Sequence, residues 1–330
     1  MNLDLAKFML KQTPSSILDP TPTMNTPLPL NTGATIPALG YGTWQSPPGE
    51  VKKAVLYALN AGYRHIDAAY CYQNEPEVGE ALKEAFAGGL KRKDVFITSK
   101  LWCTYHRRVE ENLDISLKNL GVDYLDLYLM HWPVPMNQNG NHPLFPKHPD
   151  GSRDLDSDWS YIQTWKLMEK LPATGKAKAI GVANHSVPYL EGLLKEAEIT
   201  PAVNQIENHP YLPQQEVVDF CTAKGIHVTA YSPFGSTGGP LFQEEGVQEV
   251  AKKHNVGPGT VLLSYHLARG SSVLAKSITP SRIDENRTLI KLDPTDVDAL
   301  DQIHKTKGVT RYVFPPFGPK LGFPDTEAKA

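Results

Sequence analysis

Four polar residues in the first half of the sequence could together transfer a proton. Asp67, Lys100 and His131 each stand at or directly after the end of a short apolar segment, and Tyr72 follows Asp67 closely. Taken alone, each has a structural explanation: an aspartate that caps a turn, a lysine on a solvated rim, a histidine satisfied in the core. Taken together, a carboxylate, an ammonium, an imidazole and a phenol around one cavity predict a catalytic site.

The chemistry that suits this set is the reduction of a carbonyl group. A hydride that reaches the carbonyl carbon leaves negative charge on the oxygen, so a nearby acid must supply a proton. Tyr72 is the candidate acid. Because a free phenol has a pKa of about 10, we expect the ammonium of Lys100 to stabilise the phenolate and lower that pKa. Asp67 would keep the buried lysine charged, and His131 would donate a hydrogen bond to the substrate oxygen.

Eight short apolar segments, separated by helical patterns, must position these side chains. The predicted strands are 38–42, 64–67, 95–100, 124–130, 179–182, 202–207, 227–231 and 273–276. The predicted helices are 50–61, 75–87, 107–120, 161–171, 187–197, 214–224, 246–254, 260–268 and 282–290. Apolar strands joined by helices predict a parallel sheet covered by helices, whose active site lies at the carboxyl ends of the strands. We therefore predict an α/β fold, a single-domain (β/α)8 TIM barrel, with an open doubly wound sheet as the structural alternative.

Three segments fall outside this alternation. Residues 30–36 predict an N-terminal hairpin with Gly33 in its turn. The long segments 133–158 and 308–330 are rich in proline and glycine, and they either fold over the open end of the barrel or form a surface excursion and a frayed terminus. We assign residues 28–330, including the C-terminal loop, to the barrel, and residues 1–27 to an extension that we expect to be poorly ordered.

Composition favours small-molecule chemistry in a reducing compartment. Lys and Arg number 33 against 36 Asp and Glu, for a formal net charge of -3, so no basic excess suggests nucleic acid or an anionic membrane. The three cysteines are widely spaced, which indicates neither a disulfide framework nor a metal site. No apolar run approaches the roughly 18 residues that cross a bilayer. We expect a cytoplasmic monomer that binds no metal, nucleic acid or membrane.

The segments around the four polar residues form three motifs. They read Gly-Tyr-Arg-His-Ile-Asp-Ala-Ala-Tyr-Cys-Tyr-Gln-Asn-Glu at 62–75, Ile-Thr-Ser-Lys-Leu-Trp at 97–102 and Leu-Met-His-Trp-Pro at 129–133. In this order and at these strand ends they resemble the signatures of the aldo-keto reductase family, and the match runs from about residue 28 to about residue 286. The resemblance implies an NADPH-using (β/α)8 barrel with a catalytic tetrad of Asp67, Tyr72, Lys100 and His131.

NADPH, with NADP+ as its product, is the cofactor that the resemblance implies. The stretch 40–45 begins like a dinucleotide fingerprint but has Gln45 where the third glycine belongs, so we reject a Rossmann site. The resemblance instead places Asn184 and Gln205 at the carboxamide and Tyr231 on the nicotinamide ring. The residues that it assigns to the cofactor are Thr43, Asn184, Gln205, Tyr231, Ser232, Phe234, Lys276, Ser277, Ile278, Thr279, Arg282, Glu285 and Asn286.

Cationic and hydroxyl donors gather near the end of the eighth predicted strand, at Lys276, Ser277, Thr279 and Arg282. They suit the 2′-phosphate of NADP and predict a preference for NADPH over NADH, although the two cations could also be ordinary surface charges. Three residues depart from the family pattern: Ala183, His185 and Ala275. We expect these departures to affect the tightness of cofactor binding and not the reaction type.

Trp44, Trp102 and Trp132 all stand beside tetrad or strand-end positions. They predict an apolar pocket for aldehydes and small ketones, although each could serve the core instead. The stretch Leu-Pro-Ala-Thr-Gly at 171–175 and the aromatic C-terminal tail look most like those of fungal members of the family that act on glyceraldehyde, glycerol and related polyols. Alternatives are a barrel that binds NADPH with little turnover, a reductase of a specialised secondary-metabolite ketone, or a different oxidoreductase or isomerase on the same fold.

Overall fold

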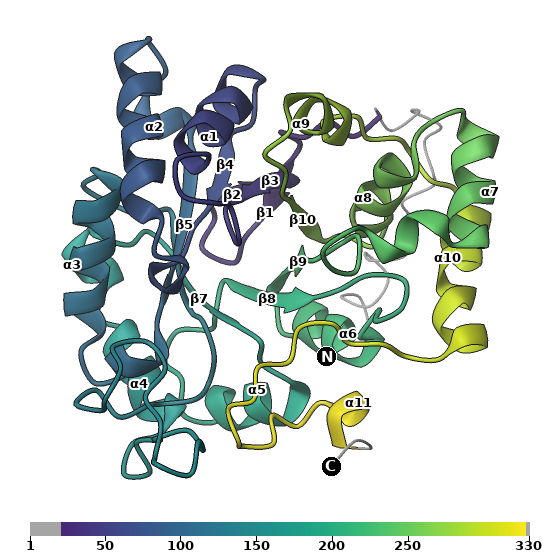
Figure 1. The fold of residues 1–330 in the computed structure, drawn as a ribbon. Coiled ribbons are helices and arrows are strands. Elements are labelled where there is room, and N and C mark those ends of the chain that lie inside the picture. Colours follow the sequence, from purple (N-terminus) through teal and green to yellow (C-terminus); the bar gives the residue numbers. More distant parts are fainter. Residues whose placement is uncertain (1–20, 328–330) are drawn as a thin grey trace, which may run out of the picture.

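Eight parallel strands form a closed barrel at the centre of the molecule (Figure 1). In the computed structural model, which describes residues 21–327, they are β3 (Leu39–Gly42), β4 (His65–Asp67), β5 (Phe96–Leu101), β6 (Leu127–Met130), β7 (Ile180–Ala183), β8 (Val203–Glu207), β9 (His227–Tyr231) and β10 (Ser272–Ala275). Strands that are neighbours along the chain pair with each other, and β10 also pairs with β3 to close the ring. The predicted (β/α)8 barrel is confirmed, and the alternative of an open sheet is wrong.

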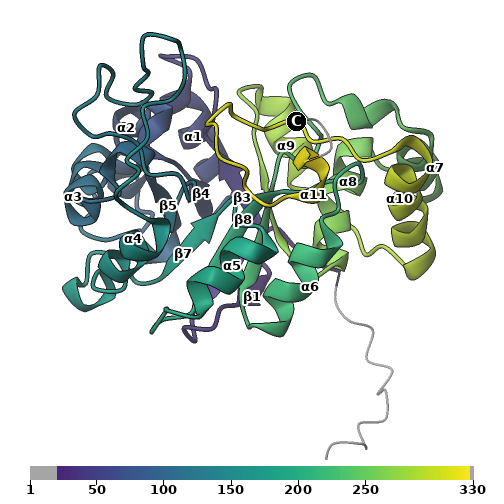
Figure 2. The same ribbon diagram turned by 90° about the horizontal axis from the view of Figure 1, so that it is seen from below.

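Helices surround the strands (Figure 2). They are α1 (Val51–Asn60), α2 (Glu75–Ala87), α3 (Val109–Leu120), α4 (Tyr161–Met168), α5 (Val187–Leu194), α6 (Gln215–Ala223), α7 (Glu245–His254), α8 (Pro258–Ala268), α9 (Pro280–Asn286), α10 (Pro294–Lys307) and α11 (Pro324–Glu327). Short 3-10 turns lie at Tyr70–Tyr72, Arg92–Asp94, Cys103–Tyr105, Pro172–Thr174 and Pro240–Gln243. Within residues 21–327, no helix has both the length and the apolar composition that a bilayer crossing requires.

The predicted alternation contains no counterpart of α10. This helix begins with a capping box, in which the side chains of Asp293 and Asp296 each accept a hydrogen bond from the other residue's backbone N–H at 3.0 Å. Its buried Leu300 and Ile303 pack with apolar residues of α7 and α8. Because α10 follows the last strand–helix unit and packs outside the strands, a prediction built on that repeating unit has no place for it.

A short hairpin lies at the amino-terminal end of the barrel strands. β1 (Pro27–Pro29) pairs antiparallel with β2 (Thr35–Pro37), and Gly33 in the turn has a φ of 82°, a left-handed conformation that glycine adopts without strain. Leu30 and Ile36 pack against apolar residues of β5, β6 and β8. The predicted N-terminal hairpin is confirmed.

The predicted N-terminal extension, 1–27, is described only in part. Its residues 1–20 lie outside the described part of the chain. The carbonyl of Met24 accepts a hydrogen bond from Leu39 N–H, and that of Thr26 accepts one from Ala38 N–H, both at 2.9 Å. These bonds attach residues 24–26 to the start of the first barrel strand.

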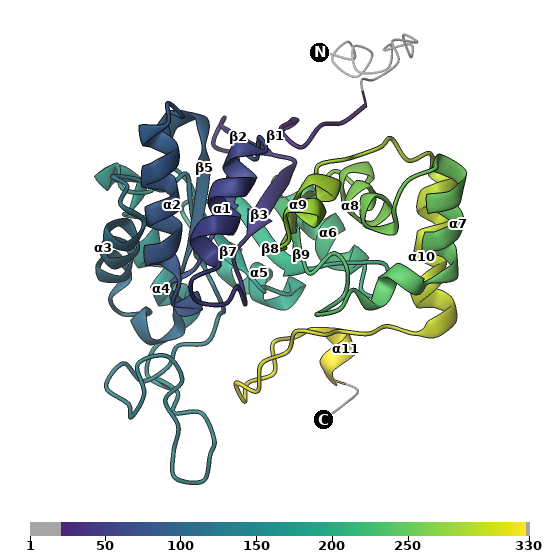
Figure 3. The same cartoon turned by 45° about the horizontal axis from the view of Figure 1, so that its top comes forward.

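Two long segments lie over the opposite end of the barrel (Figure 3). In the segment 133–158, the carbonyl of Leu144 accepts a hydrogen bond from Trp102 Nε1 at 2.7 Å. In the C-terminal tail, the N–H groups of Tyr312 and Val313 donate to the buried carboxylate of Glu207 at 2.7 and 2.8 Å. The prediction that both segments fold over the carboxyl ends of the strands is confirmed, and the alternative of a frayed terminus is wrong for the described tail.

Candidate active site

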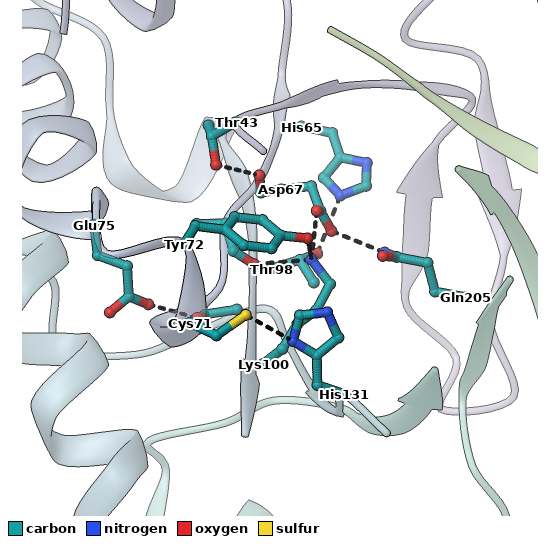
Figure 4. A network of polar contacts seen from close by, with 12 residues as sticks. Thr43, His65, Asp67, Cys71, Tyr72, Glu75, Thr98, Lys100, His131 and Gln205 are labelled. Carbon is teal, nitrogen blue, oxygen red and sulfur yellow. Dashed lines mark hydrogen bonds and ion pairs between the residues drawn. The ribbon is translucent and has the colours of Figure 1, made fainter. Parts of the chain in front are cut away.

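Asp67, Lys100 and Tyr72 form a continuous hydrogen-bonded chain at the carboxyl ends of β4 and β5 (Figure 4). Lys100 is fully buried, and its Nζ donates to Asp67 Oδ1 at 2.5 Å, to the Ala68 carbonyl at 3.0 Å and to Tyr72 Oη at 3.1 Å. All three N–H groups of the ammonium are therefore satisfied. Because a buried ammonium without a counter-ion would be destabilising, the adjacent carboxylate is what allows Lys100 to stay charged there.

Asp67 also connects this chain to the far side of the barrel. Its Oδ2 accepts a hydrogen bond from Gln205 Nε2 on β8 at 2.8 Å, and its backbone carbonyl accepts one from Thr43 Oγ1 at 2.9 Å. The pairing of Gly42 with Asp67 places Thr43 directly beside it. Since both carboxylate oxygens have donors, the side chain of Asp67 cannot rotate without losing one of them.

Tyr72 ends a single 3-10 turn that follows β4. Gln73 then takes a φ of 57°, which ends the turn and leads the chain into α2. The phenol oxygen of Tyr72 accepts the hydrogen bond from Lys100, so its own proton must point elsewhere. Within residues 21–327, no protein atom accepts that proton.

Burial raises the pKa of Tyr72 well above its ordinary value, and the negative charge of Asp67 adds to the rise. The predicted lowering of this pKa by Lys100 is therefore wrong in its net direction. A phenolate would lose its hydration in the closed site, and the attraction of one ammonium that already has a carboxylate partner does not offset that loss. The phenol stays protonated at neutral pH, as a proton donor must.

His131, which follows β6, makes a contact that the sequence did not suggest. Its Nδ1 lies 3.5 Å from Cys71 Sγ, and its ring meets that of Tyr72 edge-on with centroids 5.7 Å apart. Burial lowers the pKa of His131 well below its usual value and raises that of the Cys71 thiol, so both groups are neutral. If the thiol donates to Nδ1, the imidazole proton must reside on Nε2. Cys71 can thus hold His131 in the tautomer that donates from Nε2.

Asn184 and Tyr231 stand together beside the tetrad. Tyr231 Oη donates to Asn184 Oδ1 at 2.7 Å, and Asn184 Nδ2 donates to the backbone carbonyl of His131 at 2.9 Å. Asn184 has a φ of 61°, a conformation that residues other than glycine adopt rarely and often at functional sites. The structure therefore brings two predicted cofactor residues together beside His131.

The predicted residues after β9 lie on a loop that contacts the loop after β3. Ser232 has a φ of 54°, and the ring of Phe234 lies 5.0 Å from that of Phe242. Thr237 Oγ1 donates to Gln45 Oε1 at 3.4 Å, which joins the loop after β9 to the loop after β3. Three further predicted residues flank this region: Ile278 and Glu285, which are exposed, and Asn286, which is buried.

The segment between β10 and α9, together with the first turn of α9, carries the predicted phosphate-binding residues. Lys276, Thr279 and Arg282 are exposed, and Lys276 Nζ donates to the backbone carbonyl of Gln45 at 3.0 Å. Ser277 is buried, and its Oγ accepts a hydrogen bond from Thr279 N–H at 3.1 Å. Among the side chains that the structure describes, no carboxylate oxygen lies within 4.0 Å of either cation. Two cations without acidic partners suit a doubly charged phosphate.

Comparisons with known proteins identify the family. The model of the aldo/keto reductase family matches residues 38–305. The chain belongs to the aldo/keto reductase family. It is 58% identical over 300 residues to a D-galacturonate reductase of Hypocrea jecorina, covering 90% of this chain and 97% of the relative. It is 50% identical to a glycerol 2-dehydrogenase (NADP(+)) of Saccharomyces cerevisiae, covering 88% of this chain and 95% of that one.

A solved aldose reductase from Schistosoma japonicum has the same fold. Its TM-score to this chain is 0.81 at 42% identity, over 87% of this chain and 94% of that structure. An aldose reductase from Giardia lamblia gives a TM-score of 0.82 at 41% identity. The chain therefore shares its overall fold with solved aldose reductases.

Aromatic side chains line the mouth of this aldo/keto reductase. Trp44 is 49% exposed, and its ring centroid lies 4.8 Å from that of Tyr72. Trp102 and Trp132 are buried, and both meet the ring of Phe317 edge-on, at 6.3 and 5.3 Å. Phe317 belongs to the tail, and its place in the pocket could not be assigned from an irregular segment of sequence.

The three departures from the family pattern are all buried: Ala183, His185 and Ala275. His185 turns its ring between Tyr161 and Tyr189, and its Nδ1 lies 2.9 Å from the carbonyl of Ala183. It therefore packs with α4 and α5 instead of facing the tetrad. Among residues 21–327, no group of three or more His, Cys, Asp or Glu side chains is arranged to hold a metal ion.

Proposed function

We propose that this protein reduces aldehydes and ketones to alcohols with NADPH, and that Tyr72 donates the proton. The observation that carries the proposal is the phenol itself: its oxygen accepts a hydrogen bond from Lys100, and its proton has no acceptor within residues 21–327. Such a phenol can protonate a carbonyl oxygen while the carbon–oxygen bond order falls. Membership of the aldo/keto reductase family supports this reaction class.

Each tetrad residue would have one task in the reaction. Tyr72 Oη and His131 Nε2 would both donate hydrogen bonds to the substrate oxygen and so orient the carbonyl group. Reduced nicotinamide, when bound, supplies a hydride to the carbonyl carbon. The phenol of Tyr72 then gives its proton to the developing alkoxide, and the Lys100 ammonium stabilises the phenolate that remains. Asp67 keeps Lys100 charged and in place throughout.

We propose that the cofactor lies across the loops that follow β7, β8, β9 and β10. Asn184, Gln205 and Tyr231 would hold the nicotinamide end. Lys276 and Arg282 would bind the 2′-phosphate, because both cations lack a carboxylate partner among the described side chains. The remaining proposed contacts are Thr43, Ser232, Phe234, Ser277, Ile278, Thr279, Glu285 and Asn286.

We propose sugar and polyol carbonyls as the substrate class. The relatives are named D-galacturonate reductase, glycerol 2-dehydrogenase (NADP(+)) and D/L-glyceraldehyde reductase, at 58%, 50% and 46% identity. In this chain the exposed ring of Trp44 beside Tyr72 would support the carbon chain of the substrate, and buried Trp102 and Trp132 would bound the pocket. The expected monomeric state and cytoplasmic location remain predictions, which light scattering and a fluorescent fusion protein would check.

The test is NADPH oxidation by the purified protein with glyceraldehyde as substrate. We expect the wild type to turn over and Tyr72→Phe to lose at least about 10³-fold in kcat, because the acid is gone while the ring remains. NADPH affinity, measured by fluorescence titration, should be nearly unchanged in this variant. A Tyr72→Phe protein that keeps substantial activity with saturating NADPH would contradict the role of Tyr72. A wild type that binds NADPH and reduces no aldehyde would contradict the whole proposal.

A further inference from the structure

Arg153, in the long segment between β6 and α4, is a half-buried cation without a counter-ion. Its Nη1 donates only to the backbone carbonyl of Phe145, at 3.3 Å, and its Nε is buried with no hydrogen-bond partner. No carboxylate oxygen lies within 4.0 Å of it among the side chains that the structure describes. By contrast, the half-buried Arg92 and the buried side chain of Arg311 each hold an aspartate, at 2.8 and 2.7 Å.

An unpaired guanidinium in this position needs an explanation. Removing its charge from water is destabilising unless an anion or several acceptors replace the lost hydration. A guanidinium presents five N–H donors in a plane, a geometry that matches a carboxylate through two parallel hydrogen bonds. Arg153 uses one donor on a carbonyl, so most of its capacity is left for a ligand.

A series of aromatic contacts connects Arg153 to the proton-transfer site. Its guanidinium carbon lies 5.1 Å from the ring centroid of Phe145 and 6.0 Å from that of Phe317. Both rings contact Trp102, whose own ring lies 5.3 Å from that of His131. An aromatic wall of Trp102, Phe145 and Phe317 therefore runs from the proton-transfer site to Arg153. At 5.1 Å the guanidinium lies within cation–π range of the Phe145 ring, an attraction that helps to keep it there.

A hollow of about 470 Å³ opens beside the same guanidinium. Five residues line it, Asn141, His142, Phe145, Lys147 and Arg153, and we call it the loop hollow. Its lining contains two cations and no acid. An antiparallel backbone bridge ties Lys147 to Arg153. His142 Nδ1 accepts from the N–H groups of Leu144 and Phe145, both at 3.0 Å, so a neutral His142 carries its proton on Nε2 as a further donor.

We infer that the loop hollow binds the carboxylate of a sugar-acid substrate, and that Arg153 is the residue that selects it. The inference rests on the proposed function and names the substrate class. An open-chain uronic acid carries its aldehyde and its carboxylate at opposite ends. The aldehyde would meet Tyr72 and His131 while the carboxylate pairs with Arg153, assisted by Lys147.

The experiment compares two substrates that differ at one carbon. D-galacturonate has a carboxylate where D-galactose has a hydroxymethyl group, so the ratio of their kcat/KM values isolates the recognition of the anion. We expect the wild type to favour galacturonate and Arg153→Met to lower that ratio by about 10- to 100-fold, mainly through KM. Arg153→Lys should recover part of the ratio, and Lys147→Met should lower it less. Lys166→Met removes one exposed charge from α4 and should leave the ratio unchanged.

Two outcomes would overturn the inference. One is an equal loss for both sugars in Arg153→Met, which would mean that the guanidinium only supports the loop. The other is a wild type that reduces both sugars with the same kcat/KM. Glyceraldehyde reduction by the wild type tests the proposed function separately. Galacturonate binding to the NADP+-loaded protein, measured by calorimetry for wild type and Arg153→Met, decides the inference even if no aldehyde is reduced.

Discussion

The proton-donor chain of Asp67, Lys100 and Tyr72 contains a fully buried cation, and the loop hollow around Arg153 contains a half-buried one. In the chain, the Lys100 ammonium has three acceptors, and Asp67 accepts donors on both of its oxygens. Two of the three residues lie on barrel strands: Asp67 is the last residue of β4, and Lys100 is the last but one of β5. In the hollow, Arg153 has one carbonyl acceptor, and all the residues that line the hollow belong to the one long segment between β6 and α4.

The two cations differ in their number of partners because they serve different purposes. A group that must keep its charge in every turnover needs partners that are always present, and neighbouring strands supply them at fixed distances. A group that recognises one substrate keeps its donors for that substrate and is carried by a segment that can vary without disturbing the barrel. The two regions should therefore respond differently when their cations are removed.

The largest expected effect is that of Lys100→Met. The variant leaves the buried Asp67 carboxylate without its counter-ion, so we expect kcat to fall by about 10²- to 10⁴-fold and the free energy of unfolding to fall by about 3–5 kcal/mol. The double variant Asp67→Asn with Lys100→Met should regain most of the stability and none of the activity. Urea unfolding measures the free energy of unfolding, and NADPH oxidation measures kcat.

In the loop hollow, Arg153→Met should change the free energy of unfolding by no more than about 0.5 kcal/mol, because no carboxylate partner is left behind. A loss as large as that of Lys100→Met would break the comparison between the two regions. It would show that Arg153 is held by the fold as firmly as Lys100.

Arg282→Ala should have an intermediate effect that is confined to the cofactor. If its guanidinium binds the 2′-phosphate, the variant should raise the KM for NADPH by about 10- to 100-fold while the KM for NADH changes little. Steady-state kinetics with both cofactors measure this. Equal use of NADPH and NADH by the wild type would refute this account of the pocket. Lys166→Met again serves as the charge control.

The smallest effect on the reaction is expected for Cys71→Val. Without the thiol donor, His131 can place its proton on either nitrogen, so kcat should fall by about 3- to 10-fold while NADPH affinity stays the same. Cys71→Ser keeps a donor at this position and should retain most of the activity. Nitrogen NMR of the His131 ring would report the tautomer directly. An unchanged tautomer in Cys71→Val would show that the thiol does not position this histidine.

Much of the barrel and of the tetrad could be predicted from sequence, because each depends on a local pattern. The predicted strands end within one residue of the observed strands, and the parallel pairing of β4, β5 and β6 brings together the side chains at those ends. Asp67, Lys100 and His131 were found by this rule, since the carboxyl ends of barrel strands share one face. Tyr72 was found because it follows Asp67 closely, and the family motifs added the cofactor residues, whose roles remain predictions.

The sequence by itself determined which chemical groups meet at the end of the barrel, because strand period and strand order follow from local apolar patterns. Only the tertiary structure decided their protonation and what surrounds them. The pKa of Tyr72 rises because burial depends on every segment packed over the phenol, including those remote in sequence. Likewise, Phe317 and Arg153 are 164 residues apart in the chain and share one aromatic wall, since irregular segments carry no period from which their contacts could be inferred.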